Sequence, residues 1–178
     1  RELSAIVTQT PGAGIGEIGL DRKWVTPDTG AIEYDAQLAL FKAQLELAAS
    51  LEVPVSVHCV HAQGDLYRVL SGASALPPAI YLHAFGGAPG TVEQLIRSRR
   101  FGDRLYFGFA ACINLRSPKT RSVIAAIPED RLLLESDRAS VSDHTQLIRE
   151  LSEMLNLYAD VKGWPSFEDA ARRVTENA

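Results

Sequence analysis

The stretch Gly-Ile-Gly-Glu-Ile-Gly-Leu-Asp, residues 14–21, is the part of the sequence around which the fold is organised. Apolar side chains alternate there with glycine and one glutamate, a period of two that is typical of a β-strand. The alternation predicts that Ile15, Glu17 and Gly19 point to the same side. A carboxylate in so apolar a run is costly to bury without a partner, so we expect Glu17 to end a buried strand and to face a site. The alternative is a salt bridge between Glu17 and a neighbouring side chain.

The composition is that of an ordinary globular protein. The chain has 178 residues, 46% hydrophobic and 22% charged, and no linker or low-complexity segment divides it, so one domain over residues 1–178 is expected. A net charge of −4 gives no general attraction to nucleic acid, so a phosphate-bearing substrate must be held by local groups or by metal. Cys59 and Cys112 lack CxxC spacing, and no apolar run reaches the length of a membrane span. We therefore expect an intracellular protein without membrane association, located in the cytoplasm, the nucleus or both.

Strands and helices are predicted to alternate along the chain. Apolar residues at helical spacing predict helices at 34–51, 63–70, 91–98, 118–127, 145–158 and 167–175, with Thr91 as a helix N-cap and the tail of a further helix within 1–11. Short apolar runs predict strands that end at Glu17 and that span 55–58, 79–83, 105–109 and 131–137. Because these five strands are apolar throughout, the fold class is α/β, with a parallel sheet covered on both faces.

Polar side chains recur at equivalent places in the successive units. They lie at or just past the carboxyl end of a predicted strand, and they are Glu17, His58, His83 and Asp137. The carboxyl ends of parallel strands gather on one face, where α/β enzymes carry out their chemistry. Two imidazoles and two carboxylates suit zinc, manganese, iron or, less well, magnesium. Taken singly, a histidine at a strand end is more often a hydrogen-bonding partner than a ligand, Asp137 could be a helix N-cap, and Glu135 could pair with an arginine.

Four motifs in order resemble those of the TatD family of metal-dependent deoxyribonucleases: residues 16–21, 54–59, 82–87 and 134–137. The resemblance implies a TIM barrel of the metallo-dependent hydrolase type, which has eight βα units. Only about five units are visible in this chain, and the family's His-x-His pair on its first strand is absent. We therefore expect a TatD-like barrel that is incomplete at its N-terminus, with residues 1–178 as the C-terminal portion. Further details resemble a fungal branch named for association with a subunit of the anaphase-promoting complex.

The resemblance also implies a role for each of the four residues. Glu17 matches a carboxylate that bridges two metal ions, and His58 and His83 match the imidazoles that complete the shell of one ion. Asp137 matches an aspartate that binds the other ion and orients or deprotonates the attacking water. The implied cofactors are one or two divalent ions per chain, Mg, Mn or Zn. The implied reaction is hydrolysis of phosphodiester bonds, with 3′-to-5′ trimming of DNA as the usual activity of the family.

Several alternatives stay open at the level of sequence. Arg22 and Lys23, just past the first motif, are candidates for holding a substrate phosphate, or they are a solvated pair in a loop. The absence of a His-x-His pair favours a degenerate barrel that serves as a protein-interaction module, with an anaphase-promoting-complex subunit as its possible partner. A third hypothesis is a mononuclear amidohydrolase-like enzyme acting on a small molecule, which predicts a deep pocket with an aromatic floor formed by Trp24 or Phe85.

Overall fold

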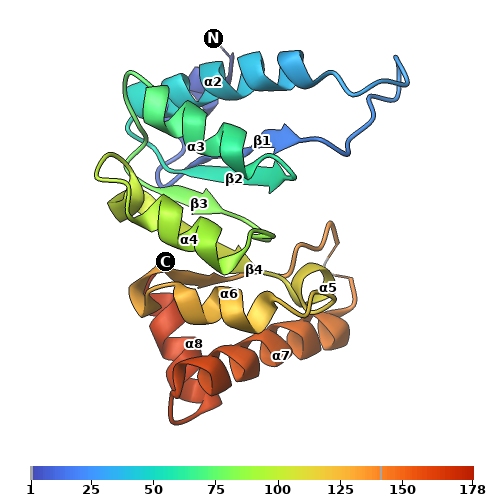
Figure 1. The fold of residues 1–178 in the computed structure, drawn as a ribbon, viewed down its shortest axis with the longest axis vertical. Coiled ribbons are helices and arrows are strands. Elements are labelled where there is room, and N and C mark those ends of the chain that lie inside the picture. The colour runs from blue at the N-terminus through green and yellow to red at the C-terminus, as the bar shows by residue number, and fades with distance from the viewer. Residues whose placement is uncertain (1, 141) are drawn as a thin grey trace. The chain divides into compact units, whose positions relative to one another are not determined.

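The computed structural model describes residues 2–140 and 142–178 (Figure 1). Arg1, within the predicted N-terminal helix tail, lies outside the described residues. The strands are β1 (Ile15–Asp21), β2 (Val55–Val60), β3 (Ile80–Leu82), β4 (Leu105–Phe109) and β5 (Leu132–Leu134). They form a five-stranded sheet in the order β1-β2-β3-β4-β5, with parallel pairing of β1 to β2, β2 to β3 and β4 to β5. The predicted parallel α/β sheet of five strands is confirmed.

Helices connect the strands, as the sequence predicts. The α-helices are α1 (Glu2–Gln9), α2 (Tyr34–Ser50), α3 (Gln63–Gly72), α4 (Pro89–Ile96), α5 (Ala111–Asn114), α6 (Thr120–Ala126), α7 (His144–Lys162) and α8 (Phe167–Glu176). Short 3-10 turns precede β4 (Gly102–Arg104) and β5 (Glu129–Arg131). The chain divides into two compact units, one of residues 1–82 with 95–105 and the other of residues 83–94 with 106–178.

In the first unit, helices cover one face of the strands. Along α2, Phe41, Leu45 and Ala48 recur at helical spacing and are at most 1% exposed. Figure 1 shows α2 and α3 beside β1 and β2. Val55 and Val57 of β2 are equally buried, whereas the side chains that alternate with them, such as His58, are only partly buried. The second face of this part of the sheet is therefore more open than the sequence predicts.

Strand β1 contains an irregularity beside Glu17. Ile15 pairs with Val55, and Ile18 pairs with Val57, so β1 has one residue more than β2 over this stretch. An extra residue in one strand disturbs the alternation of side chains. Ile15 and Ile18 are accordingly both buried, each 4% exposed, and the prediction that Ile15 and Glu17 share one face is wrong. Glu17 itself is exposed.

Some predicted boundaries also differ from the structure. Strand β1 continues past Glu17 to Asp21, because the backbone there pairs with β2 as far as Val60. Strand β5 ends at Leu134, and Asp137 has a φ of +50°, which a strand does not allow. Helix α4 begins at Pro89, a residue favoured in the first turn of a helix, so the prediction that Thr91 is its N-cap is wrong.

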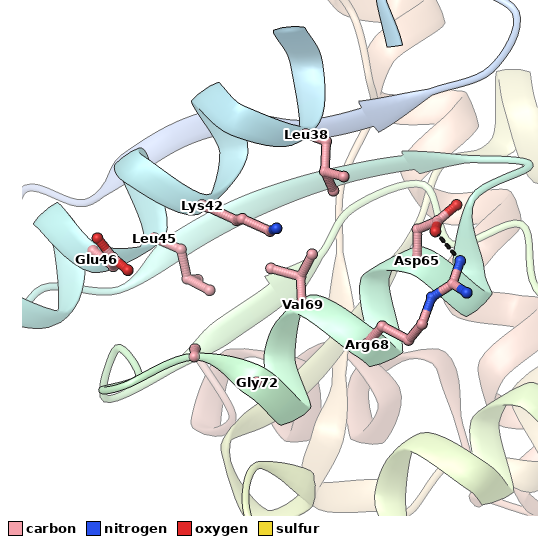
Figure 2. A pocket seen from close by; sticks show the side chains of 9 residues that line it. Leu38, Lys42, Leu45, Glu46, Asp65, Arg68, Val69 and Gly72 are labelled. Carbon is pink, nitrogen blue, oxygen red and sulfur yellow. Dashed lines mark hydrogen bonds and ion pairs between the residues drawn. The ribbon is translucent and has the colours of Figure 1, made fainter. Parts of the chain in front are cut away.

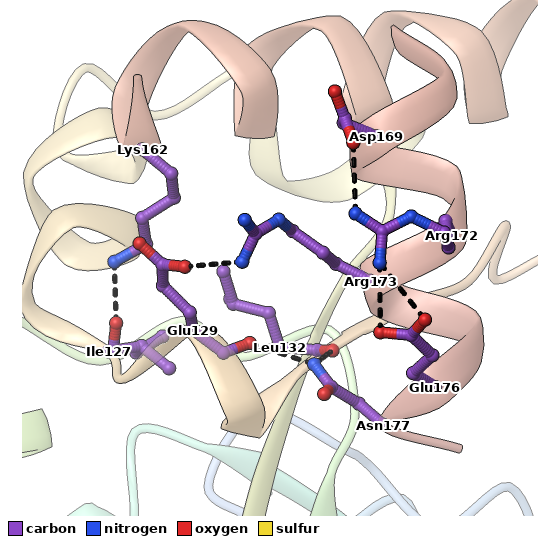
Figure 3. A network of polar contacts seen from close by, with 9 residues as sticks. All are labelled: Ile127, Glu129, Leu132, Lys162, Asp169, Arg172, Arg173, Glu176 and Asn177. Carbon is purple, nitrogen blue, oxygen red and sulfur yellow. Dashed lines mark hydrogen bonds and ion pairs between the residues drawn. The ribbon is translucent and has the colours of Figure 1, made fainter. Parts of the chain in front are cut away.

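In the second unit, the closing helix α8 is tied to the segment that carries β5. The side-chain amide of Asn177 donates to the carbonyls of Glu129 and Leu132, at 2.8 and 2.9 Å (Figure 3). The hydroxyl of Tyr158 in α7 donates to the carbonyl of Leu133 at 2.8 Å. Three carbonyls in and just before β5 are thereby bonded from the helical side, and the loop that contains Asp137 starts from this anchored strand.

Candidate metal centre

Glu17 and His58 lie on neighbouring strands in the first unit. A carboxylate oxygen of Glu17 and an imidazole nitrogen of His58 lie within 4.8 Å of each other. Zinc and similar ions bind such atoms at about 2.0–2.2 Å, so two ligands of one ion are separated by roughly 3–4 Å. The residues therefore fit a shared cation with no more than side-chain rotation. The glutamate is exposed and the His58 side chain is 34% exposed, so the pair is open to solvent.

Asp21 is a member of the site that the sequence analysis did not assign. Its Oδ2 lies 3.0 Å from Nε2 of His58. Although partial burial raises the pKa of Asp21, the net shift is downward, because the backbone N–H of Lys23 and the imidazole of His58 stabilise the carboxylate. A carboxylate bound to one ring nitrogen fixes the tautomer and orientation of a metal-binding histidine. The sequence contains a signal for this residue, because Asp21 lies four residues after Glu17 and continues the alternating pattern beyond Gly19.

The same aspartate holds the loop that follows β1. Oδ1 of Asp21 accepts from the backbone N–H groups of Lys23 at 2.6 Å and Trp24 at 3.1 Å. Gln37 of α2 accepts from the Asp21 N–H at 2.8 Å and donates to its carbonyl at 3.1 Å. Asp21, Trp24 and Gln37 line a hollow of about 320 Å³ together with Glu17 and His58. Glu17 and His58 therefore face a space large enough for a small ligand or for part of a polymer.

His83 follows β3 without an intervening residue. Val57 of β2 pairs with Leu82 of β3, and both side chains are buried, at most 1% exposed. Since side chains alternate along a strand, the next residue of β2, His58, turns to the opposite face of its strand. His83 is 7% exposed, which makes it the more buried of the two histidines.

In the second unit, Glu135 contacts the segment that begins with His83. Its Oε2 lies 3.8 Å from Nδ1 of His83, and its Oε1 accepts a hydrogen bond from the backbone N–H of Ala84. Ala84 has a φ of +41°, a left-handed conformation that is uncommon outside glycine. Glu135 thus places a carboxylate beside the ring of His83, as Asp21 does beside the ring of His58.

Asp137 lies in the second unit, in the loop three residues beyond β5, and its side chain is exposed. The residues before and after Asp137, Ser136 and Arg138, each contact another part of the second unit. The thiol of Cys112, whose pKa is raised by burial, donates to the carbonyl of Ser136 at 3.2 Å. Arg138 forms a two-pronged ion pair with Glu150 of α7, with Nε and Oε2 2.9 Å apart. Asp137 is therefore presented to solvent from a loop that is anchored on each side.

Of the two proposed phosphate-binding residues, Arg22 has partners within the protein. Its guanidinium lies 2.6 Å from a carboxylate oxygen of Asp65 and stacks on the ring of Tyr34, with 4.0 Å to the ring centroid. The Tyr34 hydroxyl donates to the same oxygen at 2.7 Å. Burial and this hydrogen bond raise the pKa of Tyr34 to about 12. The Lys23 side chain is exposed, and its backbone N–H donates to Asp21.

The Asp65 cluster makes a pH-dependent contribution to stability. Hydrogen bonds from Tyr34 and from Arg22 and Arg68 hold the pKa of Asp65 well below its usual range. A lowered pKa stabilises the fold fully above the unfolded value of about 3.9, and this contribution is lost as the pH falls below it. We expect Asp65→Asn to lower the free energy of unfolding by about 1–2 kcal/mol at pH 7. In urea unfolding measured from pH 7 to pH 3, the difference from the parent chain should shrink below pH 4.

The control for this prediction is Asp160→Asn. Asp160 also pairs with an arginine, Arg121, but both side chains are more than half exposed. Exposed ion pairs contribute little, so a change of at most about 0.5 kcal/mol is expected. A difference between Asp65→Asn and the parent that stays constant from pH 7 to pH 3 would contradict the role of the ionised Asp65.

A larger hollow, of about 480 Å³, lies between α2 and α3 (Figure 2). Apolar side chains such as Leu38 and Val69 line it, together with Lys42 and with Arg68, which pairs with Asp65. None of the four candidate ligands is among its lining residues. Size alone therefore does not identify the functional site of this protein, and the smaller hollow beside Glu17 carries the relevant chemistry.

Within the described part of the chain, no helix has the length and hydropathy needed to cross a bilayer.

The chain is similar in sequence to known proteins. The family model of TatD related DNases matches residues 1–178. The chain is 28% identical to the Cut9-interacting protein scn1 of Schizosaccharomyces pombe over 96% of its own length, and 35% identical to the 3′-5′ ssDNA/RNA exonuclease TatD of Klebsiella pneumoniae over 69%. It covers 62% and 44% of these two proteins, respectively.

A solved structure supports the same assignment. The crystal structure of YJJV, a TatD homologue from Escherichia coli, matches 99% of this chain with a TM-score of 0.74 and 25% sequence identity, and the match covers 66% of that protein. The predicted α/β fold, a TIM-barrel type with about five of eight units, is confirmed by this neighbour and by the parallel sheet. Because the family model matches the whole sequence, this chain belongs to the family of TatD related DNases.

Proposed function

We propose that this chain is part of a metal-dependent hydrolase of phosphodiester bonds, a TatD-like deoxyribonuclease that trims single-stranded DNA from its 3′ end. The observation that carries the proposal is the pair of ligand atoms from Glu17 and His58, within 4.8 Å of each other. We assign the second imidazole to His83, which directly follows β3, as the resemblance to the TatD family implies. The relative from Klebsiella pneumoniae, named as a 3′-5′ ssDNA/RNA exonuclease, supports the choice of substrate and direction.

Each residue of the proposed site has its own role. Glu17, His58 and His83 would hold one divalent cation, Mg, Mn or Zn, and Asp137 would hold a second. Bound cations of this kind lower the pKa of a water molecule and stabilise the leaving oxygen of a phosphodiester. Asp137 orients the attacking water and accepts its proton. Asp21 orients His58, which it approaches to 3.0 Å.

The proposal also accounts for the charge of the chain. A net charge of −4 would repel the phosphates of DNA, and bound cations supply positive charge where the scissile phosphate lies. We propose that residues 1–178 belong to a single TatD-like domain, since the family model runs over them without interruption. An intracellular location, in the cytoplasm or the nucleus, fits a nuclease whose Cys59 and Cys112 are both free thiols.

The test is a cleavage assay with a single-stranded oligonucleotide that carries a label at either its 5′ or its 3′ end. Magnesium, manganese and zinc are supplied in turn, and EDTA serves as the control. The proposal expects metal-dependent release of the 3′ label before the 5′ label. A folded chain that cleaves neither oligonucleotide with any of the three metals would contradict it.

A second function is favoured by the name of the Schizosaccharomyces pombe relative, which is described as interacting with Cut9. On this hypothesis the chain serves as a protein-interaction module, and its partner is a Cut9-like subunit of the anaphase-promoting complex. Co-precipitation with such a subunit tests it, and the Asp137→Asn variant separates the two functions. Partner binding that survives this substitution, in a chain without hydrolytic activity, supports the interaction module.

The amidohydrolase-like hypothesis finds less support in the geometry. It requires a deep pocket with Trp24 or Phe85 as its floor. Trp24 is 57% exposed, and Phe85 is 4% exposed with its ring packed edge-to-face on Phe107, at 5.1 Å between centroids. Neither ring has the environment of an aromatic floor beneath a small substrate.

A further inference from the structure

Trp24 is a large apolar side chain that the protein holds in solvent beside the candidate ligands. It is 57% exposed, whereas the second tryptophan, Trp164, is 7% exposed. Trp24 lines the same hollow of about 320 Å³ as Glu17 and His58. Single exposed apolar residues are common on protein surfaces and need no explanation. An exposed indole that lines the hollow next to the proposed metal ligands is a more specific observation.

The backbone of Trp24 is fixed by the residue that also orients His58. Oδ1 of Asp21 accepts from the Trp24 N–H at 3.1 Å, and Oδ2 of Asp21 lies 3.0 Å from the imidazole of His58. One carboxylate thus sets the position of the aromatic residue relative to a proposed ligand. A tryptophan on a fixed backbone has only two side-chain torsions left to order, so it loses little conformational entropy when its ring packs against a flat partner.

Cations and the exposed Lys23 can attract the phosphates of the proposed substrate, but they do not contact its bases, and an aromatic ring beside the site can. The chain carries a net charge of −4, and the guanidinium of Arg22 is paired with Asp65 and stacked on Tyr34. Proteins that bind single strands without sequence preference combine phosphate contacts with aromatic rings on which bases stack. In a duplex the bases are stacked on one another, so such a ring favours single strands.

We propose that the indole of Trp24 stacks on an unpaired nucleobase next to the phosphate that is hydrolysed. This inference rests on the proposed nuclease function. It makes Trp24 a substrate-binding residue that selects single-stranded over double-stranded nucleic acid. The contact is insensitive to the identity of the base, since every base has a flat face.

The experiment measures binding of an oligothymidylate and of an abasic oligomer of the same length. Both are titrated in the Asp137→Asn background with magnesium, so that cleavage is slow, and fluorescence anisotropy of a label on the oligomer gives the Kd. Trp24→Ala should weaken binding of the oligothymidylate by about five- to 100-fold, while the abasic oligomer binds both chains equally within about twofold. Trp24→Phe, which keeps an aromatic face, should recover part of the loss.

A matched control and a spectroscopic readout accompany the binding curves. Val25→Ala removes a neighbouring apolar side chain that is 48% exposed and does not line the hollow, and it should leave both Kd values unchanged. Thymine bases should quench the fluorescence of the exposed Trp24, and the quench should disappear in Trp24→Ala, where only the buried Trp164 remains.

The outcomes distinguish this inference from the proposed function. If the oligothymidylate binds and Trp24→Ala changes its Kd by less than twofold, the stacking role is wrong while the nuclease proposal stands. An equal loss of affinity for the abasic oligomer would also overturn stacking, because no base is present to make the contact. If neither oligomer binds the parent chain or the Asp137→Asn variant, both the inference and the nuclease proposal fail.

Discussion

The variant Asp137→Asn is expected to hydrolyse single-stranded DNA about 10²–10³-fold more slowly than the parent chain. The proposed role of Asp137 is to orient the attacking water and to accept its proton, and an amide keeps the shape of the side chain but not its basicity. The residue is exposed and has a φ of +50°. Asparagine adopts this left-handed conformation as readily as aspartate does, so the fold should be unaffected.

Initial rates at saturating manganese measure the effect, and thermal unfolding checks that the variant is folded. Asp160→Asn is the matched control, because Asp160 is an exposed carboxylate in the same unit that pairs with Arg121 at the surface. It should change the rate by less than about twofold, as exposed ion pairs contribute little. If Asp137→Asn retained the full rate, the assignment of Asp137 would be wrong.

The variant Gly19→Ala is expected to lower the free energy of unfolding by about 3 kcal/mol or more. Gly19 has a φ of +152°, and a Cβ built on it would lie 1.9 Å from the carbonyl oxygen of His58. The clashing atom belongs to the backbone of β2, which is paired with β1 at this point and cannot rotate away. Strands β1 and β2 would have to separate, and Glu17 would move relative to His58.

Urea unfolding at pH 7 measures the loss, and Gly64→Ala is the control. A Cβ at Gly64, in the first turn of α3, meets nothing within 4 Å. Alanine lowers the entropy of the unfolded chain, so Gly64→Ala should be neutral or stabilising by up to about 1 kcal/mol. Equal stabilities of the two alanine variants would show that the close approach at Gly19 is not required.

Much of the fold follows from local sequence patterns. The helical spacing of Phe41, Leu45 and Ala48 predicts α2, and the run from Leu105 to Phe109 predicts β4 with its observed boundaries. Such patterns identify elements because each amphipathic or apolar segment must bury one face. The parallel order of the strands follows from the alternation of strands and helices.

The details that position the site depend on tertiary contacts that periodicity does not report. The extra residue in β1 is visible only in the pairing of Ile15 and Ile18 with β2, so the exposure of Glu17 could not be read from alternation. The pairing of Asp21 with His58 joins residues 37 positions apart, and a single sequence does not show which carboxylate meets which imidazole. The recurrence of polar residues at strand ends identified the proposed ligands, the resemblance to a known family gave each a role, and the structure adds the carboxylates beside the two histidines.

The central claim is that Glu17, His58 and His83 hold a divalent metal ion, and metal content tests it most directly. The purified chain and the double variant His58→Ala, His83→Ala are each incubated with zinc, manganese or magnesium, desalted, and analysed by elemental mass spectrometry. The account predicts about one or more ions per parent chain and loss of that metal in the double variant. A parent chain that retains no metal, or a folded double variant that retains as much, would contradict it.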